Sequence, residues 1–438
     1  MRLPIVCLDQ RLRQYLALFS GCFSRPQHKY FVTILLGLML CQSGRTLSGL
    51  LQVVNSGVSL SGVSRFMSEA PWQAEDLAQR WQRQFRQEMT AQVLEEQARS
   101  RSQRKKKRGR PKKTVVTGYL IGDDSTMYKR RGKKMEGIGR HYSGTEKKRV
   151  TGHSLVQGLY VLLGRRCPLA PRMYRQQAVC EAEGVTFASK VDIMAEIINT
   201  FEPVVGTITH VLLDSWYTSK RIWKIARERG FLITSGLRCN RSLRIEDPDA
   251  PEGWRWQRVD EYAATLPQEA WQWLCWPNQN GKRWVYVHVV STRIKKLYRC
   301  QLVIVRGKWD DEEEERTLYW ASSDLSADLP TLIGHIATRW DVEVLFADTK
   351  ELLGLDHYQL MSATAIVRFW TLVMLAYYFL DQERDRVQRH SDNHITIGDA
   401  WRQIQRTHWC HFINWIHQRF RFGNQPADLY LELTGATL

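Results

Sequence analysis

Two short apolar segments that run into carboxylates are the features that most constrain the fold of this chain. Residues 119–126 read Tyr-Leu-Ile-Gly-Asp-Asp-Ser-Thr, and residues 209–214 read Thr-His-Val-Leu-Leu-Asp. Short apolar runs with polar ends predict buried strands. In an α/β sheet, ligands bind at the carboxyl ends of the strands. Asp123, Asp124 and Asp214 are therefore candidate site residues, although each aspartate taken alone could be a turn former or a helix cap.

A third candidate acid lies in residues 339–350, a stretch without Gly or Pro whose apolar residues recur at near-helical spacing. This pattern predicts a helix. Arg339, Glu343, Phe346 and Lys350 fall within ~60° of one another at ~100° per residue, so they share one face. That face presents a carboxylate between two cations. Taken alone, the stretch could also be a solvated helix whose Arg339–Glu343 ion pair contributes only ~0.2–0.5 kcal/mol.

Composition limits the partners and the compartment. Lysine and arginine (63) exceed aspartate and glutamate (45) by 18 charges, which favours a polyanionic partner, most often nucleic acid. The nine cysteines include no Cys-x-x-Cys pair and no zinc-like spacing, so we expect reduced thiols in a cytoplasm. Residues 30–41 and 369–380 are apolar but too short to span a bilayer, and the N-terminus lacks a signal-peptide pattern. We therefore expect no membrane partner.

Residues 1–98 predict a helical DNA-binding domain. Two short helices are expected at residues 46–54 and 59–67, separated by Asn-Ser-Gly. Together they have the outline of a helix-turn-helix, whose second helix would enter a major groove. The alternative is a helix pair that only packs and reads no DNA.

Residues 99–116 predict a basic linker that no core could bury, so we expect it to become ordered only on binding. Its Arg-Gly-Arg-Pro core, built on Arg108 and Arg110, resembles an AT-hook, in which an extended Arg-Gly-Arg lies in a narrow minor groove. The alternative is a generic tether that contacts phosphates without reading sequence.

The remaining chain predicts an α/β core that is interrupted by an insertion. Residues 117–239 hold both acid-bearing strands, and residues 317–385 hold the acid-bearing helix. Between them, residues 240–316 are rich in tryptophan and predict a β-rich insertion with a hairpin or small sheet at residues 284–305. Residues 386–438 predict a helical C-terminal region.

The three acids suggest metal chemistry. Carboxylate oxygens are hard ligands that suit Mg²⁺ or Mn²⁺ and not zinc. Three carboxylates can hold two ions, one activating water or a 3′-hydroxyl and the other stabilising the leaving oxygen of a phosphodiester. Because neighbours on a strand face opposite ways, only one of Asp123 and Asp124 is expected to share the site with Asp214 and Glu343.

These residues resemble a known signature. Arg339, Glu343 and Lys350 match the spacing of Tyr-x2-Arg-x3-Glu-x6-Lys, with Ile336 at the tyrosine position. The chain is thus similar to the DDE transposases of bacterial insertion sequences, in the IS-four superfamily. Its Asp-Asp-Ser-Thr and Asp-Ser-Trp-Tyr stretches look most like the IS-seven-oh-one group.

The resemblance implies an RNase H-like catalytic core, with the β-rich insertion before the third acid. It implies metal-dependent cleavage of double-stranded DNA at transposon ends and joining of the 3′-OH ends to target DNA. It also implies two Mg²⁺ ions, replaceable by Mn²⁺, and a homodimer on DNA in a bacterial, nucleoid-associated setting. A nuclease that does not join ends and a non-catalytic DNA-binding protein are the alternatives.

The resemblance also favours Asp123 over Asp124, because relatives show Asp-x-Ser/Thr. The catalytic and metal-binding candidates are then Asp123, Asp214 and Glu343, with Asp124 as an alternate ligand or an orienting residue. The candidate DNA contacts are Arg339, Lys350, Arg108, Arg110, Lys105, Lys106, Lys107, Lys112, Lys129, Arg130 and Trp216.

Overall fold

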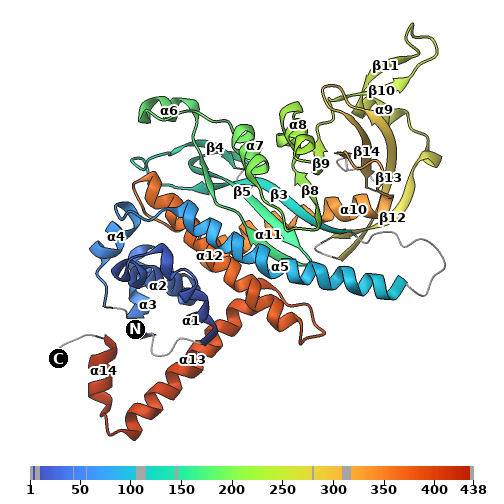
Figure 1. The fold of residues 1–438 in the computed structure, drawn as a ribbon. Helices are drawn as coiled ribbons and strands as arrows, with labels where there is room; N and C mark the ends of the chain where they lie inside the picture. Colours follow the sequence, from blue (N-terminus) through green and yellow to red (C-terminus); the bar gives the residue numbers. More distant parts are fainter. Residues whose placement is uncertain are drawn as a thin grey trace.

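A mixed sheet forms the centre of the molecule (Figure 1). The computed structural model describes residues 3–4, 10–42, 44–55, 57–104, 115–143, 147–278, 281–307 and 317–434. From one edge to the other, the strands are β12 (Gln272–Asn278), β13 (Gly281–Arg293), β14 (Arg299–Arg306), β15 (Leu318–Ser322), β9 (Leu232–Leu237), β8 (Thr207–Leu213), β3 (Val116–Tyr128), β5 (Lys148–Leu162) and β4 (Gly139–Ser143). Strands β6 (Arg165–Pro168) and β7 (Arg172–Tyr174) also pair with β5.

The two acid-bearing strands are parallel neighbours. Strand β3 pairs in parallel with β8, and β8 pairs in parallel with β9, whereas β3 and β5 are antiparallel. The β3–β8 ladder ends at Gly122 and Leu213. One expectation is corrected here, because β3 does not end at its aspartates. Only its parallel partner ends, and Asp123 to Tyr128 remain paired with β5.

The β-rich insertion extends the central sheet. The predicted hairpin at residues 284–305 is confirmed as the antiparallel pair β13–β14. Strand β15 pairs with both β14 and β9, so it joins the insertion to the core through continuous hydrogen bonding. The insertion also contains a separate hairpin, β10 (Ser242–Glu246) and β11 (Trp254–Arg258), followed by α9 (Val259–Thr265) and η3 (Gln268–Ala270).

Helices cover the other end of the sheet. Those of the N-terminal region are α1 (Gln10–Ala17), α2 (Arg25–Leu40), α3 (Leu47–Val53), α4 (Leu60–Ser68) and α5 (Ala74–Arg104), with η1 (Ser20–Cys22) and the short parallel pair β1 (Leu3–Pro4) and β2 (Val54–Asn55). The expected helix pair before α5 is α3 and α4, and the side chains of Thr46 and Ser59 cap their first turns. The C-terminal helices are α12 (Ala363–Gln388), α13 (Ile397–Arg421) and α14 (Pro426–Thr434).

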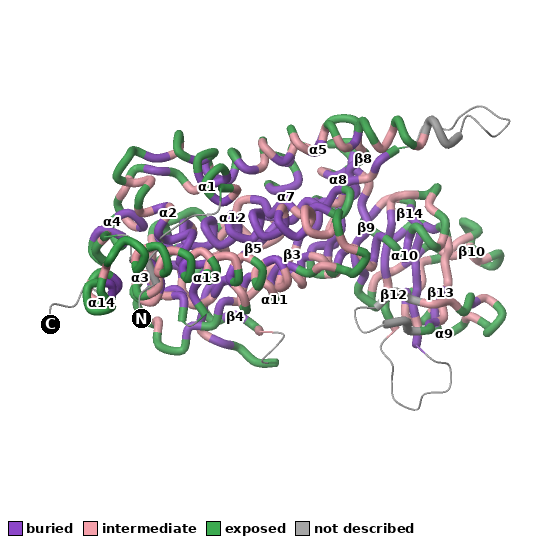
Figure 2. Tube along the Cα trace, turned by 90° about the horizontal axis from the view of Figure 1, so that it is seen from below, coloured by how far each residue is buried: buried purple, intermediate pink, exposed green. Residues whose placement is uncertain are grey.

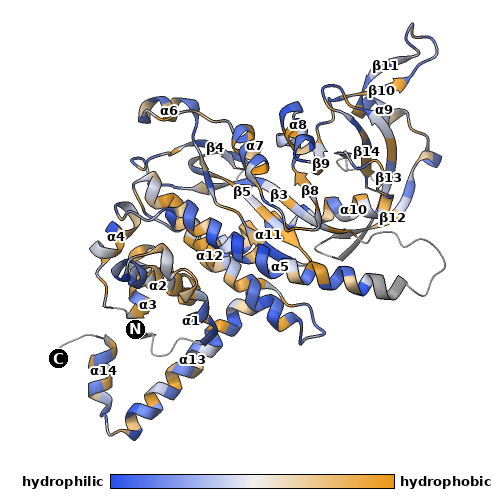
Figure 3. Cartoon of the chain, viewed as in Figure 1, coloured by the Kyte–Doolittle hydropathy of each residue, from blue (hydrophilic) through white to orange (hydrophobic). Residues whose placement is uncertain are grey.

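Helix α12 organises this helical layer. It packs against α2, α4, α5, α11 and α13 and against β6. It is long and apolar enough to cross a membrane, but 89% of its most apolar window is buried inside the molecule, as in a core helix (Figure 2). Figure 3 shows hydrophobic colour on α12 and the central strands and a mostly hydrophilic α5. One apolar cluster runs from α1 through the sheet to α13, so the N-terminal helices share their core with the sheet.

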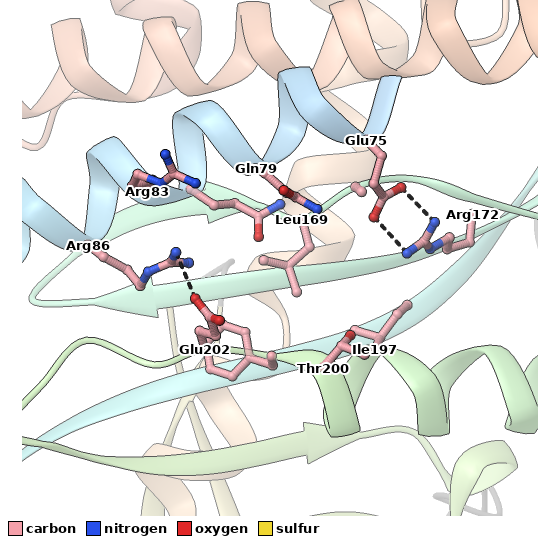
Figure 4. A pocket seen from close by; sticks show the side chains of 12 residues that line it. Glu75, Gln79, Arg83, Arg86, Leu169, Arg172, Ile197, Thr200 and Glu202 are labelled. Carbon is pink, nitrogen blue, oxygen red and sulfur yellow. Dashed lines mark hydrogen bonds and ion pairs between the residues drawn. The ribbon is translucent and has the colours of Figure 1, made fainter. Parts of the chain in front are cut away.

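Helix α5 is held onto the sheet by apolar and ionic contacts. The Trp81 side chain is fully buried, and its Nε1–H donates to the carbonyl oxygen of Pro168 at 2.8 Å. Beside it, a cavity of about 250 Å³ lies between α5 and α7 (Lys190–Thr200) (Figure 4). Two ion pairs bridge this cavity: Arg86–Glu202 at 2.9 Å and Arg172–Glu75 at 2.7 Å.

We expect the substitution Trp81→Ala to lower the free energy of unfolding by about 3–5 kcal/mol, because it leaves a large cavity in a shared core. The whole chain should still melt in one transition, measured by circular dichroism and by tryptophan fluorescence. The matched control is Leu94→Ala on the same helix, where the side chain is 61% exposed and the effect should stay within ~0.5 kcal/mol. Separate melting of residues 1–98 would contradict the shared core.

Candidate active site

Asp123 and Asp214 lie side by side where the parallel pairing of β3 and β8 stops. Each follows the last paired residue of its ladder, Gly122 in β3 and Leu213 in β8. Asp214 also precedes the short helix η2 (Ser215–Tyr217). Burial, with smaller contributions from the charges of Asp124 and Asp214, raises the pKa of Asp123 to about 7, against the opposing effect of Arg339. The site therefore disfavours two ionised carboxylates unless a cation is near.

The third acid enters on α11. The predicted helix of residues 339–350 is interrupted at its start, since α10 (Leu329–Thr338) ends before Arg339 and α11 (Asp341–Leu353) begins after Trp340. At the junction, the N–H groups of Val342 and Glu343 bond to carbonyls three residues back, which tightens the turn. Arg339 and Glu343 still share one face despite this interruption, because the Arg339 Nη2 lies 2.5 Å from the Glu343 Oε1.

Arg339 joins two of the three acids. Its Nη1 lies 3.5 Å from the Asp123 Oδ2, while its Nη2 holds Glu343. The residue is 7% exposed, and its guanidinium lies 5.8 Å from the Trp320 ring and 5.0 Å from the Trp340 ring. The Arg339–Glu343 ion pair, which the sequence offered as the alternative, is thus present, but its arginine is buried and also reaches Asp123. Its guanidinium supplies the positive charge that Asp123 and Glu343 require.

Lys350 fixes the other end of this helix face to β3. Its Nζ donates to the Ser125 Oγ at 2.7 Å, two residues beyond Asp123 on the same strand. Burial lowers the pKa of Lys350. Helix α11 ends at Gly354, whose φ of 66° places it in the left-handed region that favours glycine.

Asp124 points to a different set of partners. Its Oδ2 accepts from the Lys190 Nζ at 2.5 Å, and its Oδ1 accepts from the Tyr217 hydroxyl at 2.7 Å. Burial, followed by the charge of Asp124, raises the pKa of Tyr217 well above its ordinary value. These contacts tie β3 to α7 and η2, which fits the orienting role.

Sequence reasoning missed Lys190, although one signal could have found it. Lys190 is the first residue of α7, directly after its capping residue Ser189. A cation at a helix N-terminus is electrostatically unfavourable, so it needs a specific carboxylate nearby. Asp124 supplies that carboxylate.

The predicted DNA contacts have different positions. Trp216 follows Asp214, is 58% exposed and lies 5.2 Å from the Arg238 guanidinium, and Arg130 is also exposed. Lys129 requires a correction, because it is buried and its Nζ donates to two backbone carbonyls, those of Asp356 and Tyr358. It is therefore not available to a DNA phosphate. The linker residues Arg108, Arg110, Lys105, Lys106, Lys107 and Lys112 lie outside the described residues.

The donor set fits a hard divalent cation. Asp123, Asp214 and Glu343 offer only carboxylate oxygens, the ligands that Mg²⁺ and Mn²⁺ prefer. In the described residues, no three His, Cys, Asp or Glu side chains are close enough together to enclose an ion. The guanidinium of Arg339 lies between Asp123 and Glu343, so the structure already places a positive charge beside these two acids.

Two acids lie at the end of a parallel strand ladder, and an arginine ties one of them to a third acid on a helix. This arrangement is the one expected of a metal-dependent DNA-processing enzyme. The chain belongs to the DDE superfamily endonucleases, whose family profile matches residues 18–273, more than half of the chain. The profile of the transposase DDE domain matches residues 188–379. The predicted membership in the DDE superfamily is thereby confirmed.

The chain is similar to a curated transposase and to a transposase of known structure, among others. The probable transposase for insertion sequence element IS701 of Microchaete diplosiphon is 24% identical over 264 residues, which cover 60% of this chain and 62% of that relative. The chain thus spans less than two thirds of the relative's length. The cryo-EM structure of the piggyBac transposase synaptic complex with hairpin DNA aligns at a TM-score of 0.39 and 14% identity, covering 72% of this chain and 56% of that chain.

The raised pKa of Asp123 gives a testable dependence of stability on pH. A folded-state pKa above the unfolded one contributes stability that is full below pH 3.8 and is lost as the pH rises through about 7. Without metal, Asp123→Asn should therefore stabilise the protein at pH 8 relative to wild type, with an upper limit of roughly 4 kcal/mol. Thermal melts in EDTA at pH 4 and pH 8 measure this, and an equal difference at both pH values would contradict it.

Proposed function

We propose that this protein is a cut-and-paste DNA transposase with an RNase H-like catalytic core. It binds the terminal repeats of its insertion sequence, cleaves the DNA there and joins the 3′-OH ends to target DNA. The observation that carries the proposal is the meeting of β3, β8 and α11, which brings Asp123, Asp214 and Glu343 to one end of the parallel ladder. Membership in the DDE superfamily supports DNA cleavage as the chemistry. The mixed pairing of β5, β3, β8 and β9 supports the RNase H-like core.

Asp123, Asp214 and Glu343 would hold two Mg²⁺ ions, which Mn²⁺ can replace. When bound, such ions supply an activated water or 3′-hydroxyl and stabilise the leaving oxygen of the phosphodiester. The contacts of Asp124 with Lys190 and Tyr217 support an orienting role for Asp124 and the choice of Asp123 as the metal ligand.

Arg339 and Lys350 would bind backbone phosphates beside the three acids. With Asp123 and Glu343 holding metal, the Arg339 guanidinium would make a two-pronged phosphate contact, and Lys350 would offer a point charge. Trp216 and Arg130 add exposed groups for DNA near the strand ends. An insertion sequence has two DNA ends, and each chain offers one set of three acids. We therefore propose that two copies of the chain act as a homodimer on DNA, in the bacterial nucleoid.

Incubation of the purified full chain with DNA that carries the ends flanking its own gene tests this function. We expect cleavage with Mg²⁺ or Mn²⁺, none in EDTA, and covalent products in which a 3′-OH end is joined to a second DNA. Cleavage without joined products would favour the simple nuclease. Binding without cleavage in either metal would favour the non-catalytic DNA-binding protein.

The basic linker is expected to contribute affinity more than chemistry. Deleting residues 104–113 should weaken DNA binding and make the slope of log K against log salt shallower by ~0.9 for each phosphate that the protein no longer neutralises. Fluorescence anisotropy at several salt concentrations measures both effects. If neither affinity nor slope changed, the linker would not contact DNA.

A further inference from the structure

A groove of about 1120 Å³ lies in the β-rich insertion. Hairpin β10–β11 forms one wall, and the end of β13 with the start of β14 forms the other, beside Tyr262 and Thr265 of α9. Figure 1 shows this hairpin at the far end of the insertion, beyond β13 and β14 as seen from the helical layer. The groove exceeds the ~300–1,000 Å³ usual for small-molecule pockets. It therefore suits an extended ligand.

Arginine side chains dominate the charge of the groove. Arg244, Arg293 and Arg299 line it and are exposed. In the described part of the chain, no carboxylate forms an ion pair with any of these three. Arg255 also lines the groove, but Asp247 pairs with it at 2.9 Å.

Two of these arginines are placed against each other. Arg293 and Arg299 are directly opposite in the antiparallel register of β13 and β14. Like charges in this relation are destabilising in a sheet. The turn between them adds Lys295 and Lys296, so the repulsion is not relieved within the hairpin. A bound anion would relieve it.

Aromatic rings hold other cations at the groove in fixed positions. The Arg244 guanidinium lies 4.4 Å from the centre of the Trp254 ring, and the Arg227 guanidinium, just outside the groove lining, lies 4.7 Å from that of Tyr298. Trp254 in turn meets Trp256 edge-on at 5.5 Å. A guanidinium fixed on a ring loses less freedom when it binds a planar anionic group such as phosphate. The groove is thus prepared for several phosphates.

We infer that this groove binds the phosphodiester backbone of duplex DNA, as a second contact separate from the three acids. The inference rests on the proposed function, because the ligand is the DNA that the site would cut. Three arginines that form no ion pair in the described residues fit several phosphates, and Glu246 is the one acid among the described residues that line the groove. Backbone contacts of this kind position a protein on DNA without reading its sequence.

The test uses the full chain in EDTA, so that binding is measured without chemistry. The double variant Arg293→Gln/Arg299→Gln should bind a duplex of the element end more weakly at low salt. Its slope of log K against log salt should be shallower by ~1.8, because two phosphates are no longer neutralised. The matched control is Arg406→Gln, an exposed arginine on α13, and its slope should equal that of wild type.

An unchanged slope in the double variant would overturn the inference. The inference would also be overturned if the double variant bound single-stranded DNA of the same length more weakly but bound the duplex as wild type does, because the groove would then be a site for unpaired bases. Arg244→Gln is a second variant at a distinct position and should reduce the slope by ~0.9. Failure of the proposed function would appear differently, as wild-type protein that binds in EDTA with the full slope but does not cleave with Mg²⁺.

Discussion

Asp214→Asn should reduce the metal-dependent cleavage rate by a factor of roughly 1,000 or more, while the protein stays folded. The substitution keeps the shape of the side chain and removes the negative charge that a divalent ion needs. Metal-ion catalysis stabilises the transition state by several kcal/mol, and ~4 kcal/mol corresponds to about a thousandfold in rate. Asp214 is a better choice than Asp123 for this test, because it forms no ion pair with Arg339 in the structure.

The measurement is a single-turnover cleavage assay on element-end DNA, with Mn²⁺ binding followed in parallel. The matched control is Asp392→Asn, which removes the same charge from an exposed position between α12 and α13. The control should cleave at the wild-type rate. If Asp214→Asn cleaved at the wild-type rate, the assignment of the three acids would be contradicted, and cleavage would depend on other residues.

Arg339→Gln should be the most destabilising substitution at the site. Removing one partner of a buried ion pair leaves an uncompensated charge, which costs about 3–5 kcal/mol. We expect roughly 3 kcal/mol, the lower end, because the Glu343 side chain is 37% exposed. In EDTA the variant should melt lower than wild type, and Mg²⁺ should raise its melting temperature by more than it raises that of wild type, since metal replaces the missing cation.

The control is Arg389→Gln, which breaks another i,i+4 pair, with Asp385, at a position where the arginine side chain is 57% exposed. Its effect should not exceed ~0.5 kcal/mol. Arg339→Lys separates charge from geometry, because lysine keeps the charge but cannot make the two-pronged contact. If Arg339→Lys cleaved at the wild-type rate across a range of salt, Arg339 would be a structural cation and not a phosphate ligand.

The elements that carry the acids could be predicted because local patterns determine them. The apolar runs before Asp123 and Asp214 predict strands, and the spacing of Arg339, Glu343 and Lys350 survives in the structure although the helix is interrupted at residues 339–340. The backbone geometry of a helix or strand sets which side chains share a face, so this arrangement follows from the local sequence.

Side-chain partners could not be predicted in the same way. Lys129 belongs to a stretch that reads as a basic loop, yet it is buried against Asp356 and Tyr358, more than two hundred residues away in the sequence. The partnership of Asp124 with Lys190 is of the same kind. Such contacts depend on which elements meet, and no local pattern encodes that.

By itself, the sequence determined the acid-bearing strands and helix, the basic charge and the family signature, because each follows from residue type and spacing along the chain. Only the tertiary structure decided which partners Asp123 and Asp124 contact and that Arg339 lies between Asp123 and Glu343. The same holds for the pairing of Arg293 with Arg299. The physical reason is that strand register and helix docking set distances between residues far apart in sequence, and electrostatic energy depends on those distances.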